Sequence, residues 1–85
     1  MFTLKNSTAI GRRGVLELKR GTIQTPFFMP VGTAGAMKGL THQDILDVGA
    51  QLLLCNTYHL LLQPGDELVA EAGGLHKFID WDKPI

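Results

Sequence analysis

The chain has 85 residues, of which 45% are hydrophobic and 19% are charged, a composition typical of a globular protein and not of a disordered or collagen-like one. Its apolar runs are only a few residues long and its first residues lack the pattern of a signal peptide, so we expect neither a membrane span nor a secretory leader. A single cysteine excludes an internal disulfide framework and favours a reducing compartment, so we expect a cytoplasmic protein.

The net charge is zero, but the two halves of the chain carry opposite charge. Residues 1–38 hold six basic residues against one acidic residue, and residues 39–85 hold two basic residues against seven acidic residues. A polyanionic partner for the basic half would explain this division. Solvated faces on separate elements explain it more simply, and we favour that interpretation.

The N-terminal segment, residues 1–26, predicts a β-hairpin. Leu16 and Leu18 alternate with polar neighbours, which is the period of a half-buried strand. Gly21 can adopt the backbone conformation of a tight turn, and Pro26 ends the pairing because it has no N–H to donate.

Two strand–helix units are predicted next. Residues 27–31 and 51–56 are continuous apolar runs, which are typical of strands buried on both faces of a parallel sheet. Residues 40–49 and 64–72 have the residue pattern of helices.

Residues that cap helices mark the ends of both predicted helices. Thr41 suits the N-cap of the first helix, Asp44 stands where a capping box places its carboxylate, and Gly49 follows the last turn. Pro64 suits the first position of the second helix, and Gly73 ends it. Alternating strands and helices favour a parallel α/β sheet.

A parallel sheet of two strands has two open edges, and such sheets occur almost only with both faces covered. The last residues, Pro84 and Ile85, resemble the start of another strand. We therefore expect these residues to be part of a larger α/β domain that is cut before its third parallel strand.

Candidate binding residues follow the two apolar runs, because functional groups of parallel α/β folds lie at the carboxyl ends of the strands. Residues 31–35 form a glycine-containing loop that lacks the spacing of a P-loop or of a dinucleotide fingerprint. Residues 56–59 are Asn, Thr, Tyr and His, and the Asn56 amide can both donate and accept hydrogen bonds. The alternatives are an ordinary loop for the first segment and a polar cap of the next helix for the second.

The remaining reactive side chains do not predict a catalytic centre. Cys55 and His59 are too few for a metal site, and burial among leucines would raise the pKa of the Cys55 thiol and make it inert. No carboxylate stands at a strand end, so no acid–base pair is apparent.

Three segments resemble the N-terminal region of the tRNA-guanine transglycosylase family, also called queuine tRNA-ribosyltransferases, and fit its bacterial type. The resemblance covers nearly the whole chain in register and rests on residues 25–33 (TPFFMPVGT), residues 55–60 (CNTYHL) with Pro64-Gly65, and residues 73–78 (GGLHKF) with Trp81-Asp82.

The resemblance implies a TIM (β/α)8 barrel of which the chain contains the beginning. Residues 1–26 would be a hairpin cap, 27–49 the first βα unit, 50–74 the second, and 75–85 the lead into the third strand.

The activity implied by the resemblance is the exchange of guanine at the wobble position of tRNAs with GUN anticodons for a 7-deazaguanine base, within queuosine biosynthesis. One aspartate would attack the ribose anomeric carbon and a second would act as general acid and base. Neither aspartate matches a residue of this chain, so we expect the 85 residues alone to be inactive. The family's zinc lies in a C-terminal subdomain whose ligands are also absent here, and no metal is expected in this chain.

Four residues match the family's substrate pocket. Val31 and Leu54 match apolar positions near the target ribose, and Asn56 and Thr57 match residues that hold the acid–base aspartate. The loop from Ala34 to Lys38, together with Leu60, matches a region of homodimer contact. Two other classes of function remain open: a small RNA-binding module that uses Arg12, Arg13 and Arg20, and an inactive structural remnant.

Overall fold

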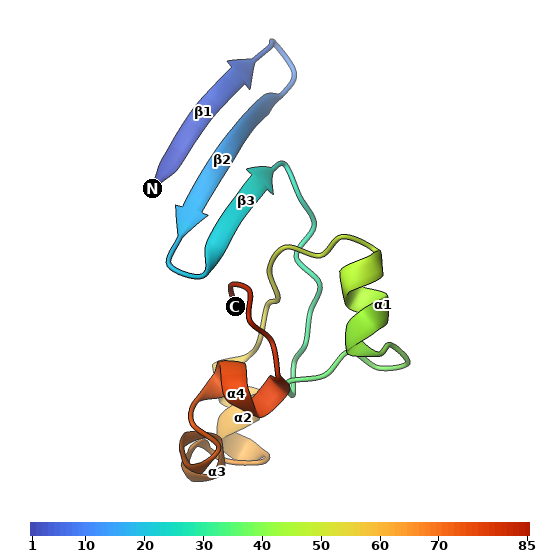
Figure 1. The fold of residues 1–85 in the computed structure, drawn as a ribbon, viewed down its shortest axis with the longest axis vertical. Coiled ribbons are helices and arrows are strands. Elements are labelled where there is room, and N and C mark those ends of the chain that lie inside the picture. The colour runs from blue at the N-terminus through green and yellow to red at the C-terminus, as the bar shows by residue number, and fades with distance from the viewer.

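The computed structural model describes residues 1–85, with an antiparallel sheet at one end and four short helices at the other (Figure 1). The extents are 46 × 27 × 20 Å and the radius of gyration is 14.8 Å, against about 12 Å for a compact chain of this length. The shape is therefore elongated. The elements are β1 (Phe2–Ser7), β2 (Arg12–Leu18), β3 (Gly21–Thr25), α1 (His42–Asp47), α2 (Thr57–Leu62), α3 (Asp66–Glu71) and α4 (Leu75–Ile79).

The sheet contains the predicted hairpin, β2 and β3, and a third strand that the prediction missed. Strand β1 pairs antiparallel with β2, and the sheet order is β1-β2-β3. The register between β1 and β2 shifts between Leu4 and Asn6, which is the mark of a β-bulge. Phe2 and Leu4 alternate with Thr3 and Lys5, but the bulge interrupts this pattern after only a few residues, and all six residues of this edge strand are exposed.

The Phe2 ring covers Gly14 in the neighbouring strand. A Cβ built on Gly14 would meet the Phe2 ring and would lie 2.8 Å from the carbonyl oxygen of Thr3. We expect Gly14→Ala to destabilise the protein by about 1–3 kcal/mol, because the ring and the strand must move apart. Urea denaturation would measure the loss. Gly11→Ala is the matched control, since its Cβ meets nothing closer than 4.0 Å, and an equal loss in both variants would contradict this explanation.

Helix α1 confirms the capping residues that were predicted for it. The Thr41 hydroxyl accepts a hydrogen bond from the Asp44 amide (3.1 Å), and the Asp44 carboxylate accepts from the Thr41 amide and hydroxyl (2.8 Å each). These bonds to Thr41, the backbone one first, lower the pKa of Asp44. The helix is shorter than the predicted 40–49 because Thr41 and Val48 are its caps.

We expect the capping box to make stability depend on pH. Because the pKa of Asp44 is lowered in the folded state, its contribution is present above the unfolded pKa of about 4 and is lost as the pH falls through the folded pKa. Thr41→Val removes the hydroxyl and should cost about 1 kcal/mol at neutral pH, with a smaller loss at pH 3. Denaturation at both pH values tests this. Thr41→Ser keeps the hydroxyl and should behave like the wild type.

Three of the helices end in the same arrangement of hydrogen bonds, a Schellman motif. After α1, Ala50 donates its N–H to Ile45 O (3.2 Å) and Gly49 donates to Leu46 O (2.9 Å). The same pair of bonds closes α3 through Gly73 and Gly74, and α4 through Asp80 and Trp81. Asp80 adopts the left-handed conformation there, with φ 54°.

The hydrogen bonds after α2 and α3 define the limits of the helix that was predicted over residues 64–72. Gly73 ends α3 as predicted, Gly74 is the second residue of its Schellman motif, and Leu75 begins helix α4. Helix α3 begins at Asp66 and not at Pro64, because the Gly65 amide is still bonded to Leu60 O (2.9 Å) at the end of α2.

The two apolar runs meet side by side and in parallel, but only at one bridge, Val31 with Leu54. Gly32 donates its N–H to Leu54 O (2.8 Å), and Leu54 donates to Pro30 O (2.9 Å). On the other side, Leu53 donates to Pro84 O (3.1 Å). The N–H groups of Leu53 and Leu54 therefore bond to segments on opposite sides, as those of successive residues in the central strand of a parallel sheet do.

The prediction that both runs form strands buried on both faces is wrong for this chain. Neither run forms a regular strand, and Phe28 is 81% exposed. Side chains of a parallel strand are buried only when layers cover both faces, and the four short helices cover only part of these runs.

The core lies where α1, the second apolar run and the C-terminal residues meet. Its buried residues are Ile45, Ala50, Leu53, Ile79 and Trp81, with half-buried neighbours that include Cys55 and Leu75. The Trp81 indole N–H donates to Pro84 O (3.1 Å), which fixes the C-terminal residues beside the core. Only 11 of the 85 residues are buried, so this core is small.

The sheet is joined to this core through the side chain of Gln51. Its Oε1 accepts from the Gln24 N–H (2.7 Å) and its Nε2 donates to Gln24 O (3.3 Å). Ile23, on the neighbouring position of β3, is completely buried.

None of the helices has the length and hydropathy that crossing a lipid bilayer would require.

Candidate functional site

The candidate site lies at the carboxyl ends of the two paired runs. The structure brings Val31 and Leu54 together in the parallel bridge, although the two residues are 23 positions apart in the sequence. Both side chains are about half exposed. The chain continues from Leu54 into Asn56 and Thr57, so all four predicted pocket residues lie at or just beyond one edge of the parallel pair.

Asn56 is the N-cap of helix α2. Its side-chain oxygen Oδ1 accepts from the His59 N–H (3.2 Å), which satisfies one of the free amides of the first turn. The capping role that was one of the two alternatives for residues 56–59 is therefore confirmed for Asn56. Capping uses only the oxygen, and the amide nitrogen Nδ2 has no partner within the chain, so it is free to donate to a carboxylate or a base.

The residues after Asn56 belong to a helix that the prediction missed. Thr57 begins α2 and lines a cavity of about 350 Å³ between α2, α3 and α4, together with Leu61, Val69 and Leu75 among others. The Tyr58 and His59 rings lie edge to face, with centroids 5.8 Å apart. The sequence does contain a signal for the start of this helix, because Asn56 is a favoured N-cap residue and stands directly before it.

The predicted contact residues fall in two different environments. Ala34 and Lys38 line an open hollow of about 640 Å³ beside Val31, in the loop that follows the first run. Leu60 is only 8% exposed, so its side chain is directed into the chain. Its neighbours Leu61 and Leu62 are exposed. The role of all three predicted residues in contact between subunits stays a prediction.

Cys55 has the character that its sequence neighbours predicted. It is half-buried beside the core, and this burial raises the pKa of its thiol. A thiol with a raised pKa is a poor nucleophile at neutral pH. No group of three or more metal-ligating side chains gathers anywhere in the chain.

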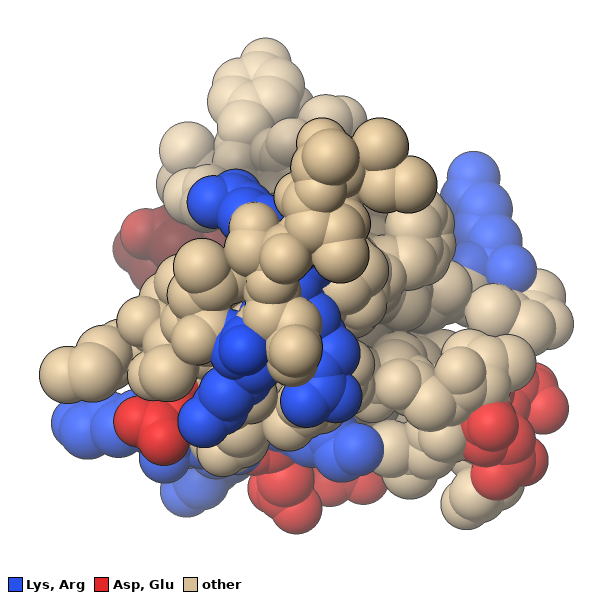
Figure 2. Space-filling model, turned by 90° about the horizontal axis from the view of Figure 1, so that it is seen from above, with Lys and Arg blue, Asp and Glu red and all other residues tan.

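The basic residues do not form the single patch that an RNA-binding hairpin would need. Arg12 and Arg13 lie at the start of β2, whereas Arg20 lies in the turn at its other end, about 20 Å away along the strand. Figure 2 looks onto the end of the sheet near the β1–β2 connection and shows basic side chains in several places, near the centre of the view and at its right and lower-left margins, with acidic ones between and beside them.

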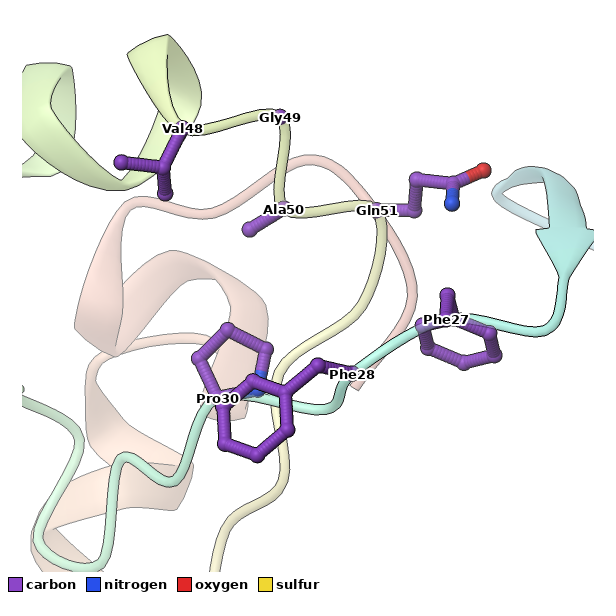
Figure 3. Close-up of a pocket in the computed structure, with 7 residues that line it drawn as sticks. All are labelled: Phe27, Phe28, Pro30, Val48, Gly49, Ala50 and Gln51. Carbon is purple, nitrogen blue, oxygen red and sulfur yellow. The ribbon is translucent and has the colours of Figure 1, made fainter.

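An apolar groove that the sequence did not indicate lies beside the first residues of the second run. It has a volume of about 260 Å³ and runs between residues 27–30 and the segment from Val48 to Gln51 (Figure 3). The Ala50 side chain points towards the Pro30 ring, the Phe28 ring lies beyond that ring, and the Gln51 side chain points away towards β3. The groove contains no predicted site residue and lies at the opposite end of the parallel pair.

Comparison with known proteins gives one consistent result. A family model described as queuine tRNA-ribosyltransferase matches residues 6–85. Similar curated proteins named queuine tRNA-ribosyltransferase include those of Neisseria gonorrhoeae (56% identical), Chromobacterium violaceum (52%) and Idiomarina loihiensis (49%), each over 84 residues and 99% of this chain. The chain spans only 22–23% of the length of these relatives.

Proposed function

The chain belongs to the queuine tRNA-ribosyltransferase family, and from this we propose that it works as the N-terminal part of a longer tRNA-modifying enzyme. This enzyme exchanges guanine at the wobble position of tRNAs with GUN anticodons for a 7-deazaguanine base, and in the bacterial type the base is 7-aminomethyl-7-deazaguanine. We further propose a TIM barrel for the whole enzyme, its location in the cytoplasm, and a homodimer that uses residues 34–38 and Leu60.

The observation that supports this proposal best is the grouping of Val31, Leu54, Asn56 and Thr57 at one edge of a parallel strand pair. In parallel α/β folds this edge carries the active site. Leu54 bonds to Pro30 on one side and Leu53 bonds to Pro84 on the other. This arrangement supports a third parallel strand at Pro84, beside the second run, as the sheet of a barrel requires.

These residues would position a catalytic group and would not react themselves. The two aspartates proposed for nucleophilic attack and for proton transfer do not match residues of this chain. The free Asn56 Nδ2 would donate to the acid–base carboxylate, hold its orientation and favour its ionised form until it takes a proton. Val31 and Leu54 would contact the apolar face of the target ribose.

A base-exchange assay on a protein of the relatives' full length tests the proposal. We expect radiolabelled guanine to enter a tRNA with a GUN anticodon, and 7-aminomethyl-7-deazaguanine to displace it. A tRNA with adenine at the wobble position is the matched control and should incorporate nothing. Lack of incorporation into the GUN tRNA, or equal incorporation into both, would contradict the proposal.

The family's structural zinc would be held by residues outside this chain.

A further inference from the structure

A small polar pocket lies between the β2–β3 turn and the C-terminal residues. Its volume is about 250 Å³, and its lining residues are Arg20, Gly21, Thr22, Gln51, Lys83 and Pro84. The pocket forms because the turn packs against the C-terminal residues: a Cβ on Gly21 would lie 3.7 Å from Cδ of Pro84. Two segments that are 63 positions apart, at Arg20 and Lys83, thus place one cation each beside the same hollow.

Neither cation is neutralised within the chain. Arg20 and Lys83 make no ion pair within 4.0 Å, although Glu17 stands opposite Thr22 in the sheet register and shares its face. The Thr22 hydroxyl makes no hydrogen bond in the chain, and the Gln51 amide, which donates one N–H to Gln24 and accepts one from it, keeps a second N–H without a partner. Lys19 and His76 line an adjoining hollow together with Arg20, which adds further basic groups nearby.

We propose that this pocket binds a phosphate group. A guanidinium offers several N–H donors in one plane, an ammonium adds a compact positive charge, and a free hydroxyl supplies a further donor, which together match the oxygens of a phosphate. Arg20 and Lys83 are exposed, but both come from backbone segments that the core and Gln51 fix beside the same pocket.

This pocket is separate from the candidate site at the other end of the parallel pair. Gln51 begins the second run and Asn56 ends it, a distance of about 16 Å in extended chain. The proposal therefore does not depend on the proposed base exchange. A bound phosphate would link the sheet to the C-terminal residues in addition to the Gln24–Gln51 bonds, and it would stabilise the folded state by mass action.

Line broadening in the ³¹P NMR spectrum of inorganic phosphate tests the site at constant ionic strength. We expect the protein to broaden the phosphate line, and Arg20→Gln or Lys83→Gln to lower the apparent affinity about tenfold. Thr22→Val, which removes only the hydroxyl, should cause a smaller loss. Arg13→Gln removes one positive charge at the other end of β2 and is the matched control, expected to bind like the wild type.

Dimethyl phosphate as a second probe distinguishes the two sources of a phosphate group. Broadening of both probes assigns the pocket to the phosphodiester backbone of a nucleic acid, whereas broadening of inorganic phosphate alone assigns it to free phosphate or a phosphate monoester. The proposal is overturned if the variant Arg20→Gln/Lys83→Gln broadens both lines as the wild type does. An equal loss in Arg13→Gln would likewise overturn it, because that result would show a general charge effect.

Discussion

Replacing Asn56 with alanine, in a protein of the relatives' full length, is expected to lower the rate of base exchange about 10- to 100-fold. The affinity for tRNA should change by less than about threefold. The reason is that Asn56 would orient the acid–base carboxylate through its free Nδ2 and would contribute little to the binding of the nucleic acid. Steady-state kinetics that separate kcat from KM for tRNA would measure both effects.

Two further substitutions separate the proposed donor role of Asn56 from its observed role as a helix cap. Asp and Ser both keep a side-chain oxygen that can accept from the His59 N–H, but ionised Asp has no donor and the only donor of Ser is a hydroxyl on a shorter side chain. If the donor role is real, Asn56→Asp and Asn56→Ser lose rate although α2 keeps its cap. If capping is the whole role, both variants exchange bases at the wild-type rate while only Asn56→Ala is impaired.

The largest loss of stability is expected at Trp81. Its side chain is 3% exposed, belongs to the core cluster, and donates a hydrogen bond to Pro84 O. Trp81→Ala should cost about 3–5 kcal/mol, because it leaves a cavity in a core of only five buried residues. Chemical denaturation followed by circular dichroism would measure this loss.

Trp81→Phe separates the volume of the ring from its hydrogen bond. Pro84 O still accepts from the Leu53 N–H after the substitution, so no buried acceptor is left without a partner. We expect a loss of about 1 kcal/mol. The exposed His42 ring, whose centroid lies 6.2 Å from that of Trp81, gives the control His42→Ala, with a loss below about 0.5 kcal/mol. A loss at His42 as large as at Trp81 would contradict this description of the core.

Elements specified by local chemistry were predictable from the sequence. Gly21 predicted the β2–β3 turn, and Thr41, Asp44 and Gly49 predicted α1 with its caps, because these signals act within a few residues of chain. All four helices are too short to show a helical period, so only end signals could predict them. Helix α4 begins after Gly74, which has no capping side chain, and the cap of α2, Asn56, was also a candidate binding residue.

Features that depend on distant neighbours were predicted less well. The parallel pairing of the two apolar runs was correct at Val31 and Leu54, but their burial was not, because burial requires layers that this chain does not supply. The location of the candidate site at a strand end followed from fold rules, whereas the dual use of Asn56 as a cap and a free donor required the structure. The Arg20–Lys83 pocket joins residues far apart in sequence, so no local pattern indicated it.

Photo-crosslinking of a tRNA that carries 6-thioguanosine at the wobble position tests the central claim most directly. In a protein of the relatives' full length, the account predicts crosslinks within this chain at residues 31–35 or 54–59, mapped by mass spectrometry, because these segments meet at the carboxyl edge of the parallel pair. Crosslinks confined to the sheet around Arg12 and Arg13, with none at the carboxyl edge, would contradict the account and would favour a separate RNA-binding role for the sheet.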